Sequence, residues 1–422
     1  MKSTIISLLT IISTGISAQL APNQMNPLDL PTDEIPMFII LGFDDNPNLR
    51  QGLLDSLSKR KNKDGSPVLA SFYSNTTASS NQSWIDMHKK FAAAGHEIAL
   101  HTHSHISSNS SSQNEIQNSI EKNKTLLSEN LKVNENLLTG FRTPFLEVND
   151  KVLISVENLG LTYDCSIEEG YQDGHEPGNY NWPYTLDNGA SKSWDKIRKF
   201  GWMLDEPINS HPGIWEIPVY TWLLPPDSVS ESYGVPKGFR TEIQKRYNST
   251  NPFWPKDLAA NDWKIEGFDY NIWDQYKFTD SEFTAVLKYN FDRMHQGNKT
   301  PFTIGLHSSY YGEGYNWDYQ QDTDKALFDF IDYATQFSDV RFITAQHLVD
   351  WLEKPTPISP ILTENIQEFS NFEIYNIKGE LIQAATPISK LQELDKSLPQ
   401  GMWILKTFNN SGNSFTQKII IQ

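Results

Sequence analysis

The feature that most constrains this fold is a regular alternation of short apolar runs with amphipathic stretches that begins near residue 36. Residues 36–43 (PMFIILGF) and 67–74 (PVLASFYS) are typical of buried strands, and residues 49–60 between them are typical of a helix. The same alternation predicts further elements, in chain order: helix 83–94, strand 96–101, helix 113–130, strand 137–141, helix 150–159, helix 281–295, strand 301–307, helix 323–337, strand 340–344 and helix 345–353. Strands that alternate with helices predict an α/β fold with a parallel sheet or barrel.

The charge and the cysteine content exclude several classes of protein. The chain has 422 residues and a net charge of −17, and it contains no basic block, which argues against nucleic acid and anionic membranes as partners. Its single cysteine, Cys165, excludes a disulfide scaffold and a cysteine-based zinc site. A metal ion would therefore need histidine and carboxylate ligands.

Both ends of the chain carry signals that differ from the central pattern. Residues 1–18 combine a lysine, an apolar run and a small-residue end, which predicts a signal peptide cleaved before Gln19. The alternatives are an N-terminal strand or a membrane anchor, but the run is short for a membrane span, which needs about 20 apolar residues. Residues 355–370 are predicted to be a linker. Residues 371–422 show strand and turn patterns that predict a small antiparallel β module.

The predicted catalytic domain spans residues 36–354 and contains an insertion over residues 170–280, in which the strand–helix pattern is lost. Eight of the twelve tryptophans of the chain fall in this insertion. Insertions of this length without regular structure are usually functional. The tryptophans either pack the loops together or form a wall of sugar-stacking rings beside an active site.

Two adjacent acids, Asp44 and Asp45, follow the first predicted strand directly. Strand C-termini form the catalytic rim of an α/β barrel, and two like charges in a dry site are costly unless something compensates them. The alternative for this pair is a solvated turn.

A histidine cluster, HTHSH, ends the predicted strand 96–101. His101 and His105 are four residues apart, and together with one carboxylate they would make an open three-ligand metal site. His103 is expected to point elsewhere.

Two further side chains follow predicted strands. Arg142 can grip a carboxylate through two parallel hydrogen bonds and keep it ionised. His307 ends the strand 301–307, where it is placed for general acid catalysis, although a lone histidine is more often a surface residue.

The motifs FDD, HTHSH and RTPF, in this order, resemble those of the polysaccharide deacetylases, carbohydrate esterase family four, which have the NodB-homology fold. The resemblance runs from about residue 36 to residue 357. Its finer detail is similar to the insect chitin deacetylases, in the segments LGLTYDCS, WPYTLDN, GIWEIPVYTW and NKTPFTIGLH.

The resemblance implies a distorted (β/α) barrel and a divalent metal ion, most often zinc, held by Asp45, His101 and His105. It makes Asp44 the general base that activates water and Arg142 the residue that orients this base. His307 would protonate the leaving amine. The residues expected at the oxyanion and substrate are Phe145, through its backbone N–H, with Pro144, Trp215 and Tyr184.

Three positions depart from the family pattern. Gly42 stands in place of a Thr or Ser, Asn46 in place of a Gly, and Gly305 in place of a Leu. No clear Asp–Trp motif that would support His307 is found. Both acids of the pair are present, which favours an active enzyme.

The C-terminal segments IYNIKGELI, LPQGMWILK and QKIIIQ resemble the sorting domain of the type IX secretion system, and a carbohydrate-binding module is the alternative. The expected function is removal of N-acetyl groups from chitin or chitooligosaccharides by a protein that is secreted or on the cell surface. The alternatives are an O-acetyl esterase on xylan or another acetylated glycan, and a non-catalytic glycan-binding protein. The expected partners are the glycan substrate and the secretion machinery.

Overall fold

The structure is a computed structural model that describes residues 20–246, 257–312, 322–353, 369–376, 381–387, 401–409 and 414–421. The predicted signal peptide, Trp254 and most of the predicted linker lie outside these ranges. None of the helices in the described ranges has the length and apolar character that a membrane span requires.

A curved sheet forms the centre of the larger unit. Its strands follow the order β12–β1–β2–β3–β4–β5–β8–β7, and β13 pairs with β1. All of these pairs are parallel except β7 with β8. The strands are β1 (Met37–Asp45), β2 (Ser71–Ser74), β3 (Glu97–Leu100), β4 (Gly140–Phe141), β5 (Tyr163–Asp164), β7 (Tyr184–Thr185), β8 (Trp215–Glu216), β12 (Phe302–His307) and β13 (Val340–Phe342). The predicted distorted (β/α) barrel is confirmed, as a curled sheet whose end strands β12 and β7 do not pair in the described chain.

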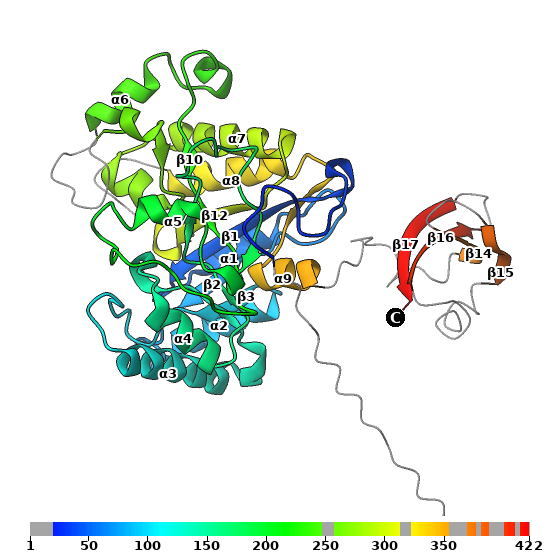
Figure 1. Ribbon diagram of the computed structural model, residues 1–422, viewed down its shortest axis with the longest axis horizontal. Helices are drawn as coiled ribbons and strands as arrows, with labels where there is room; N and C mark the ends of the chain where they lie inside the picture. Colours follow the sequence, from blue (N-terminus) through cyan, green and yellow to red (C-terminus); the bar gives the residue numbers. More distant parts are fainter. Residues whose placement is uncertain are drawn as a thin grey trace, which may run out of the picture.

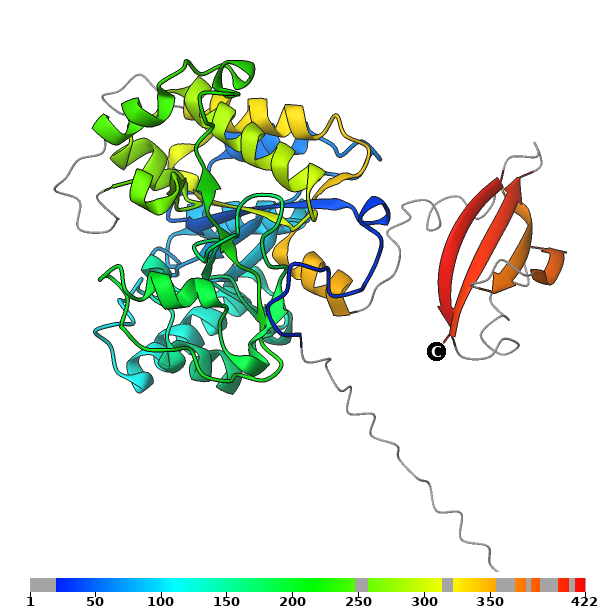
Figure 2. The ribbon, with the colours of Figure 1, turned by 45° about the horizontal axis from the view of Figure 1, so that its top comes forward.

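Helices cover the outside of this sheet. Helices α7 and α8 lie together on one side, and α3 and α4 lie together on the other (Figures 1 and 2). The helices are α1 (Gln51–Ser58), α2 (Gln82–Ala93), α3 (Gln113–Leu131), α4 (Asp150–Asn158), α5 (Lys192–Ile197), α6 (Phe239–Arg246), α7 (Asp280–Gln296), α8 (Thr323–Ala334) and α9 (Ala345–Glu353). Capping boxes begin the two longest helices, with Ser112 and Glu115 at α3 and Thr279 and Glu282 at α7. Every helix predicted outside the insertion is confirmed.

The strand register brings the candidate residues to one edge of the sheet. Asp44 of β1 lies beside His307 of β12, and Asp45 lies beside Ser74 of β2. Strand β3 ends at Leu100, which pairs with Phe141 at the end of β4. Because parallel strands end at the same edge, the residues that follow them meet there.

The insertion over residues 170–280 contains short elements in place of long ones. Strand β6 (Glu168–Glu169), just before it, pairs with β9 (Val219–Tyr220), and β10 (Trp222–Leu223) pairs with β11 (Lys264–Ile265). Five tryptophans of the insertion are at most 3% exposed: Trp182, Trp194, Trp215, Trp222 and Trp273. Trp202 and Trp263 are partly buried and pack against the same core. The described tryptophans therefore pack the loops of the insertion together, as one of the two interpretations predicts.

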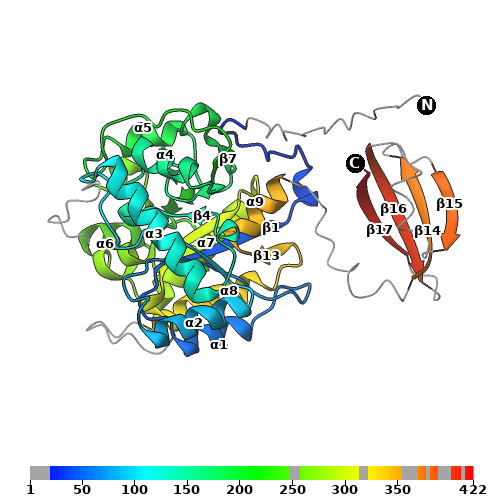
Figure 3. The same ribbon diagram turned by 90° about the horizontal axis from the view of Figure 1, so that it is seen from below.

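The C-terminal module is a four-stranded antiparallel sheet with the order β15–β14–β16–β17 (Figure 3). Its strands are β14 (Phe369–Asn376), β15 (Leu381–Pro387), β16 (Gly401–Asn409) and β17 (Ser414–Ile421). Phe372 and Ile374 of β14 are fully buried. The predicted antiparallel module is thereby confirmed.

Candidate metal-binding active site

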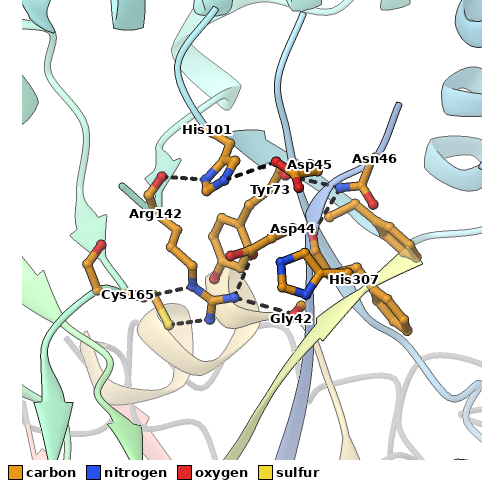
Figure 4. A network of polar contacts seen from close by, with 12 residues as sticks. Gly42, Asp44, Asp45, Asn46, Tyr73, His101, Arg142, Cys165 and His307 are labelled. Carbon is orange, nitrogen blue, oxygen red and sulfur yellow. Dashed lines mark hydrogen bonds and ion pairs between the residues drawn. The ribbon is translucent and has the colours of Figure 1, made fainter. Parts of the chain in front are cut away.

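The two acids at the end of β1 interact with different side chains. The Asp44 carboxylate accepts a hydrogen bond from Nη1 of Arg142 at 2.8 Å (Figure 4), and only 5% of Asp44 is exposed. Asp45 has a left-handed backbone, with φ of 66°, and its carboxylate faces two histidines. The change of backbone conformation between the two residues separates their side chains.

Asp45, His101 and His105 form the one group of three or more possible metal ligands in the described part of the chain. Oδ1 of Asp45 lies 3.1 Å from Nε2 of His105 and 3.6 Å from Nε2 of His101. One ligand atom from each residue lies within 4.8 Å of the others. His103 points away, because its ring nitrogen pairs with the Thr76 hydroxyl at 2.8 Å.

The hydrogen bonds and the charges of this group suit a divalent cation. Nδ1 of His101 pairs with the Arg142 carbonyl at 2.8 Å, which leaves Nε2 as the ligand atom. Burial, and then the neighbouring His101, lower the pKa of His105 to about 4, so this ring is neutral near pH 7, as a ligand must be. Burial alone would raise the pKa of Asp45, but His101, His105 and His307 together lower it. The residues therefore fit a metal ion, and two imidazoles with one carboxylate are a typical zinc set.

A rigid cradle holds the Arg142 guanidinium. Nε donates to the Cys165 carbonyl at 2.7 Å, Nη2 lies 3.0 Å from the Cys165 sulfur, and the Tyr73 ring lies 4.2 Å from the guanidinium carbon. A Cβ atom at Gly42 would stand 2.8 Å from Nη1. Gly42, one of the departures from the family pattern, thus leaves the space that the guanidinium occupies.

The other two departures also have structural explanations. Asn46 has φ of 52°, a conformation that Asn tolerates, and its side-chain amide donates to the carbonyls of Phe43 and Tyr73. A Cβ atom at Gly305 would lie 2.4 Å from the Phe268 ring. Gly305 therefore makes room for an aromatic side chain that the insertion contributes.

His307 is held by a residue that the sequence analysis missed. The buried carboxylate of Asp269 accepts from Nδ1 of His307 and from its backbone N–H, both at 2.8 Å. Burial alone would lower the pKa of His307, but Asp269, with Asp44 and Asp45, raises it to about 9. The imidazole therefore carries a proton near neutral pH. No local signal identified Asp269, because it lies 38 residues before His307 in an irregular segment.

The loop after Arg142 has an unusual backbone. Phe145 has φ of 59° and Leu146 has φ of 54°, while Pro144 is buried. The Phe145 ring is 58% exposed and lies edge-on to the His105 ring, with centroids 4.5 Å apart. Left-handed conformations at non-glycine residues are strained and often mark functional sites.

One pocket of about 340 Å³ joins these groups. Its lining residues are Asp44, Asp45, His101, His105, Phe145, Leu146, Glu266, Phe268, Tyr270 and His307. Glu266 and Tyr270 were not predicted. Trp215 and Tyr184, which the resemblance suggested for substrate contact, do not line it: they are 2% and 1% exposed. Their polar atoms bond to Glu353 and to the Ser191 N–H instead.

Comparison with known proteins identifies two families in this chain. Residues 33–163 match the family model for polysaccharide deacetylase, and residues 355–422 match that for the secretion system C-terminal sorting domain. Chitin deacetylase 1 of Bombyx mori is 21% identical over 361 residues, which are 83% of this chain and 56% of the relative. The chain thus spans little more than half the length of that relative.

Several solved structures are similar to this chain at sequence identities of 20% or less. A protein of Mycobacterium smegmatis assigned to the polysaccharide deacetylases is 16% identical, with a TM-score of 0.47 over 79% of this chain and 95% of that one. The family 4 carbohydrate esterase from Streptomyces lividans in complex with acetate is 20% identical, with a TM-score of 0.26 over 31% and 64%.

The sorting domain gives the location of the protein, which is secreted or held at the cell surface. The deacetylase match covers β1 to β4 and so includes Asp44, Asp45, His101, His105 and Arg142. The chain therefore contains a polysaccharide deacetylase domain and a secretion system C-terminal sorting domain.

Proposed function

We propose that this protein is a metal-dependent hydrolase that removes N-acetyl groups from chitin or chitooligosaccharides. The observation that carries the proposal is one pocket whose lining includes the three candidate metal ligands together with Asp44 and His307. Arg142 donates a hydrogen bond to Asp44, and Asp269 accepts one from His307. The similarity to a chitin deacetylase supports the choice of substrate.

Asp45, His101 and His105 would hold the metal ion, for which zinc is our proposal. When bound, such an ion would polarise the acetyl carbonyl and lower the pKa of a coordinated water. Asp44 accepts the proton of the attacking water, and the hydrogen bond from Arg142 holds its carboxylate in place. The water oxygen then forms a bond with the acetyl carbon.

The remaining groups assist the departure of the amine. The Phe145 N–H makes no hydrogen bond within the described chain, and we assign it as a donor to the oxygen that becomes negative. His307 gives a proton to the leaving nitrogen from Nε2, because Asp269 occupies Nδ1. The C–N bond breaks, and the products are acetate and a free amino sugar unit.

The test is acetate release by the purified full-length protein from chitopentaose and from acetylxylan at equal acetyl concentration. We expect release from chitopentaose, its loss with a chelator and its return with added zinc. Asp44→Asn, prepared in parallel, controls for contaminating enzymes. Faster release from acetylxylan would make the protein an O-acetyl esterase. The absence of release from both substrates by the zinc-loaded protein would refute the hydrolase proposal.

A further inference from the structure

The loop that carries two of the three candidate metal ligands has an unusual backbone. It spans residues 101–105, directly after β3, and Thr102 and His105 have left-handed conformations, with φ of 59° and 51°. Such conformations are strained at residues other than glycine, and they persist only where the surrounding structure imposes them. The contacts around this loop therefore decide whether His101 and His105 can meet Asp45.

Helix α3 holds this loop through two of its residues. Ser119 and Asn123 lie four residues apart and so share one face of the helix. Oδ1 of Asn123 accepts from the backbone N–H of His101 at 3.0 Å. The backbone N–H of His103 lies 2.9 Å from the Ser119 carbonyl and 3.1 Å from the Ser119 hydroxyl, and both accept from it. Two alternate residues of the loop are thus fixed to one helix face.

The nitrogen of the Asn123 amide is tied to β2. Nδ2 donates to the Ser74 carbonyl at 3.0 Å and to the Thr76 hydroxyl at 3.2 Å. Ser74 is the last residue of β2, and it is the register partner of both Asp45 on β1 and Leu100 on β3. One side chain therefore joins the end of β2 to the loop that follows β3.

The segment that Asn123 holds also contacts the third candidate ligand. Asn75, which follows β2 directly, donates its backbone N–H to the Asp45 carbonyl at 3.1 Å. Its side-chain amide donates to Oδ1 of Asp45 at 3.4 Å. Asn123 thus lies between the hydrogen bonds that hold Asp45 and the one that holds His101.

A comparable asparagine elsewhere shows what is particular to Asn123. Asn290 on α7 is fully buried, as Asn123 is. Its Oδ1 accepts from the Leu223 N–H at 2.8 Å, and its Nδ2 donates to the Leu223 carbonyl at 3.0 Å. A buried amide needs such partners wherever it lies, because an unpaired one is costly. The Leu223 partner of Asn290 belongs to β10, whereas Asn123 binds a candidate ligand and the strand beside Asp45.

From these contacts we infer that Asn123 is a positioning residue for the metal ion: it joins β2 to the ligand loop so that Asp45, His101 and His105 converge before the ion binds. The inference rests on the metal site of the proposed function and assigns that site a residue outside its ligands. Asn123 does not line the pocket, so it acts through the backbone that carries the ligands and not on the substrate. A site that is already ordered loses less conformational entropy on binding, and its affinity is higher for that reason.

The first test measures zinc affinity by competition with a chelator, which requires no turnover. In full-length Asn123→Ala we expect an affinity about 10–100-fold weaker than in the wild type, the range typical when groups that orient metal ligands are removed. Asn290→Ala is the matched control. It also deletes a buried amide, so it should lose stability to chemical denaturation as Asn123→Ala does, but it should keep the zinc affinity of the wild type. Unchanged affinity in Asn123→Ala, or an equal loss in both variants, would overturn the inference.

A second variant, Asn123→Asp, provides the same test if the alanine variant fails to fold. It keeps the size of the side chain and an acceptor for the His101 N–H, but an ionised carboxylate has no donor for the Ser74 carbonyl. The added negative charge would by itself favour a cation. A weaker zinc affinity, which we expect, must therefore come from the lost contact with β2. An affinity equal to that of the wild type, or higher, would contradict the inference.

Excess zinc separates a positioning role from a direct role in the chemistry. At saturating zinc, kcat of Asn123→Ala should return toward the wild-type value, because no side chain that lines the pocket is changed. A kcat that stays low while elemental analysis shows bound zinc would mean that Asn123 does not act through metal affinity, and the inference would fail.

Zinc affinity and acetate release together distinguish the two proposals. If the wild type binds zinc, and Asn123→Ala binds it more weakly, but no acetate is released, the deacetylase function is refuted and the role of Asn123 stands. Acetate release with unchanged zinc affinity in Asn123→Ala refutes the role of Asn123 and leaves the function intact. A wild type that binds no zinc refutes the inference together with the zinc site.

Discussion

Asp44 and Asp45 are neighbours in the chain whose carboxylates have different surroundings. Asp44 is buried against Arg142, whereas Asp45 faces two imidazoles and is partly exposed. The guanidinium holds the Asp44 carboxylate at the pocket, where it can accept a proton. A residue that faces imidazoles can share a cation with them. The two acids should therefore fail in different ways when they are changed.

We expect Asp45→Asn to lose metal affinity, because an amide is a weaker ligand than a carboxylate, and excess zinc should restore part of the activity. Asp44→Asn should keep the metal and lose about 10²–10⁴-fold in turnover, with no rescue by zinc. Elemental analysis beside the rate measures both effects. Loss of metal in Asp44→Asn alone would exchange the two roles, and unchanged metal and rate in both variants would contradict the site.

The His307–Asp269 pair predicts a pH dependence. The pKa of His307 is raised to about 9, so the acid form persists at neutral pH and is lost as pH rises through that value. Asp269→Asn removes the main source of this increase and should move the alkaline limb of the kcat/KM profile to lower pH. His307→Ala should lower turnover by about 10²–10⁴-fold with the metal retained. An alkaline limb that stays in place in Asp269→Asn would show that another group supplies the proton.

At the scale of elements, the site is assembled from the ends of strands. β1, β3, β4 and β12 each end at a candidate residue or directly before one, and β5 ends directly before Cys165. Cys165 joins β5 to the site, because its carbonyl and sulfur hold Arg142. The position of Asp44 thus depends on the packing of several strands.

This dependence predicts a difference between two variants of Cys165. Cys165→Ala removes the sulfur that Nη2 of the fully buried Arg142 contacts, and we expect a loss of about 1–3 kcal/mol in the free energy of unfolding. Cys165→Ser retains an acceptor and should lose less. Chemical denaturation measures both, and kcat shows whether Asp44 is still held. Equal stability of the two variants would mean that the sulfur contact contributes little.

At the scale of the whole molecule, we propose that the catalytic unit of residues 36–354 and the module of residues 371–422 are separate domains. The first contains every residue of the candidate site. The second is an antiparallel sheet whose four described strands pair with one another. The second unit lies within the match to a secretion system C-terminal sorting domain, and we propose that it directs export. The predicted signal peptide lies outside the described residues.

Truncation after Pro357 tests this division. We expect the shortened protein to fold and to hydrolyse soluble oligomers within about threefold of the full-length rate, because no site residue is removed. The host cell, by contrast, should no longer export it correctly. The measurements are kcat/KM, the melting temperature of the catalytic unit and the location of the protein after cell fractionation. A truncated protein that cannot fold would place the module within the catalytic domain.

The sequence by itself determined the strands and helices of the barrel and the candidate residues that lie near the strand ends. The periodicity of apolar residues predicted the strands and helices of the barrel, because burial on both faces of a parallel strand leaves a continuous apolar run. Asp44, Asp45, His101 and Arg142 were identifiable because each lies at the end of such a strand or directly after it, and His105 because it lies four residues beyond His101. These signals are carried by neighbouring residues and need no knowledge of distant contacts.

Only the tertiary structure decided which distant residues complete the site. Asp269 and Glu266 come from an insertion without periodicity, and their proximity to His307 depends on how that insertion packs. The same packing buries Trp215 and Tyr184, which had been expected at the substrate. A contact between residues far apart in the chain depends on the packing of everything between them. No local pattern of residue types can encode it, and for that reason the partner of His307 and the lining of the pocket appeared only in the folded protein.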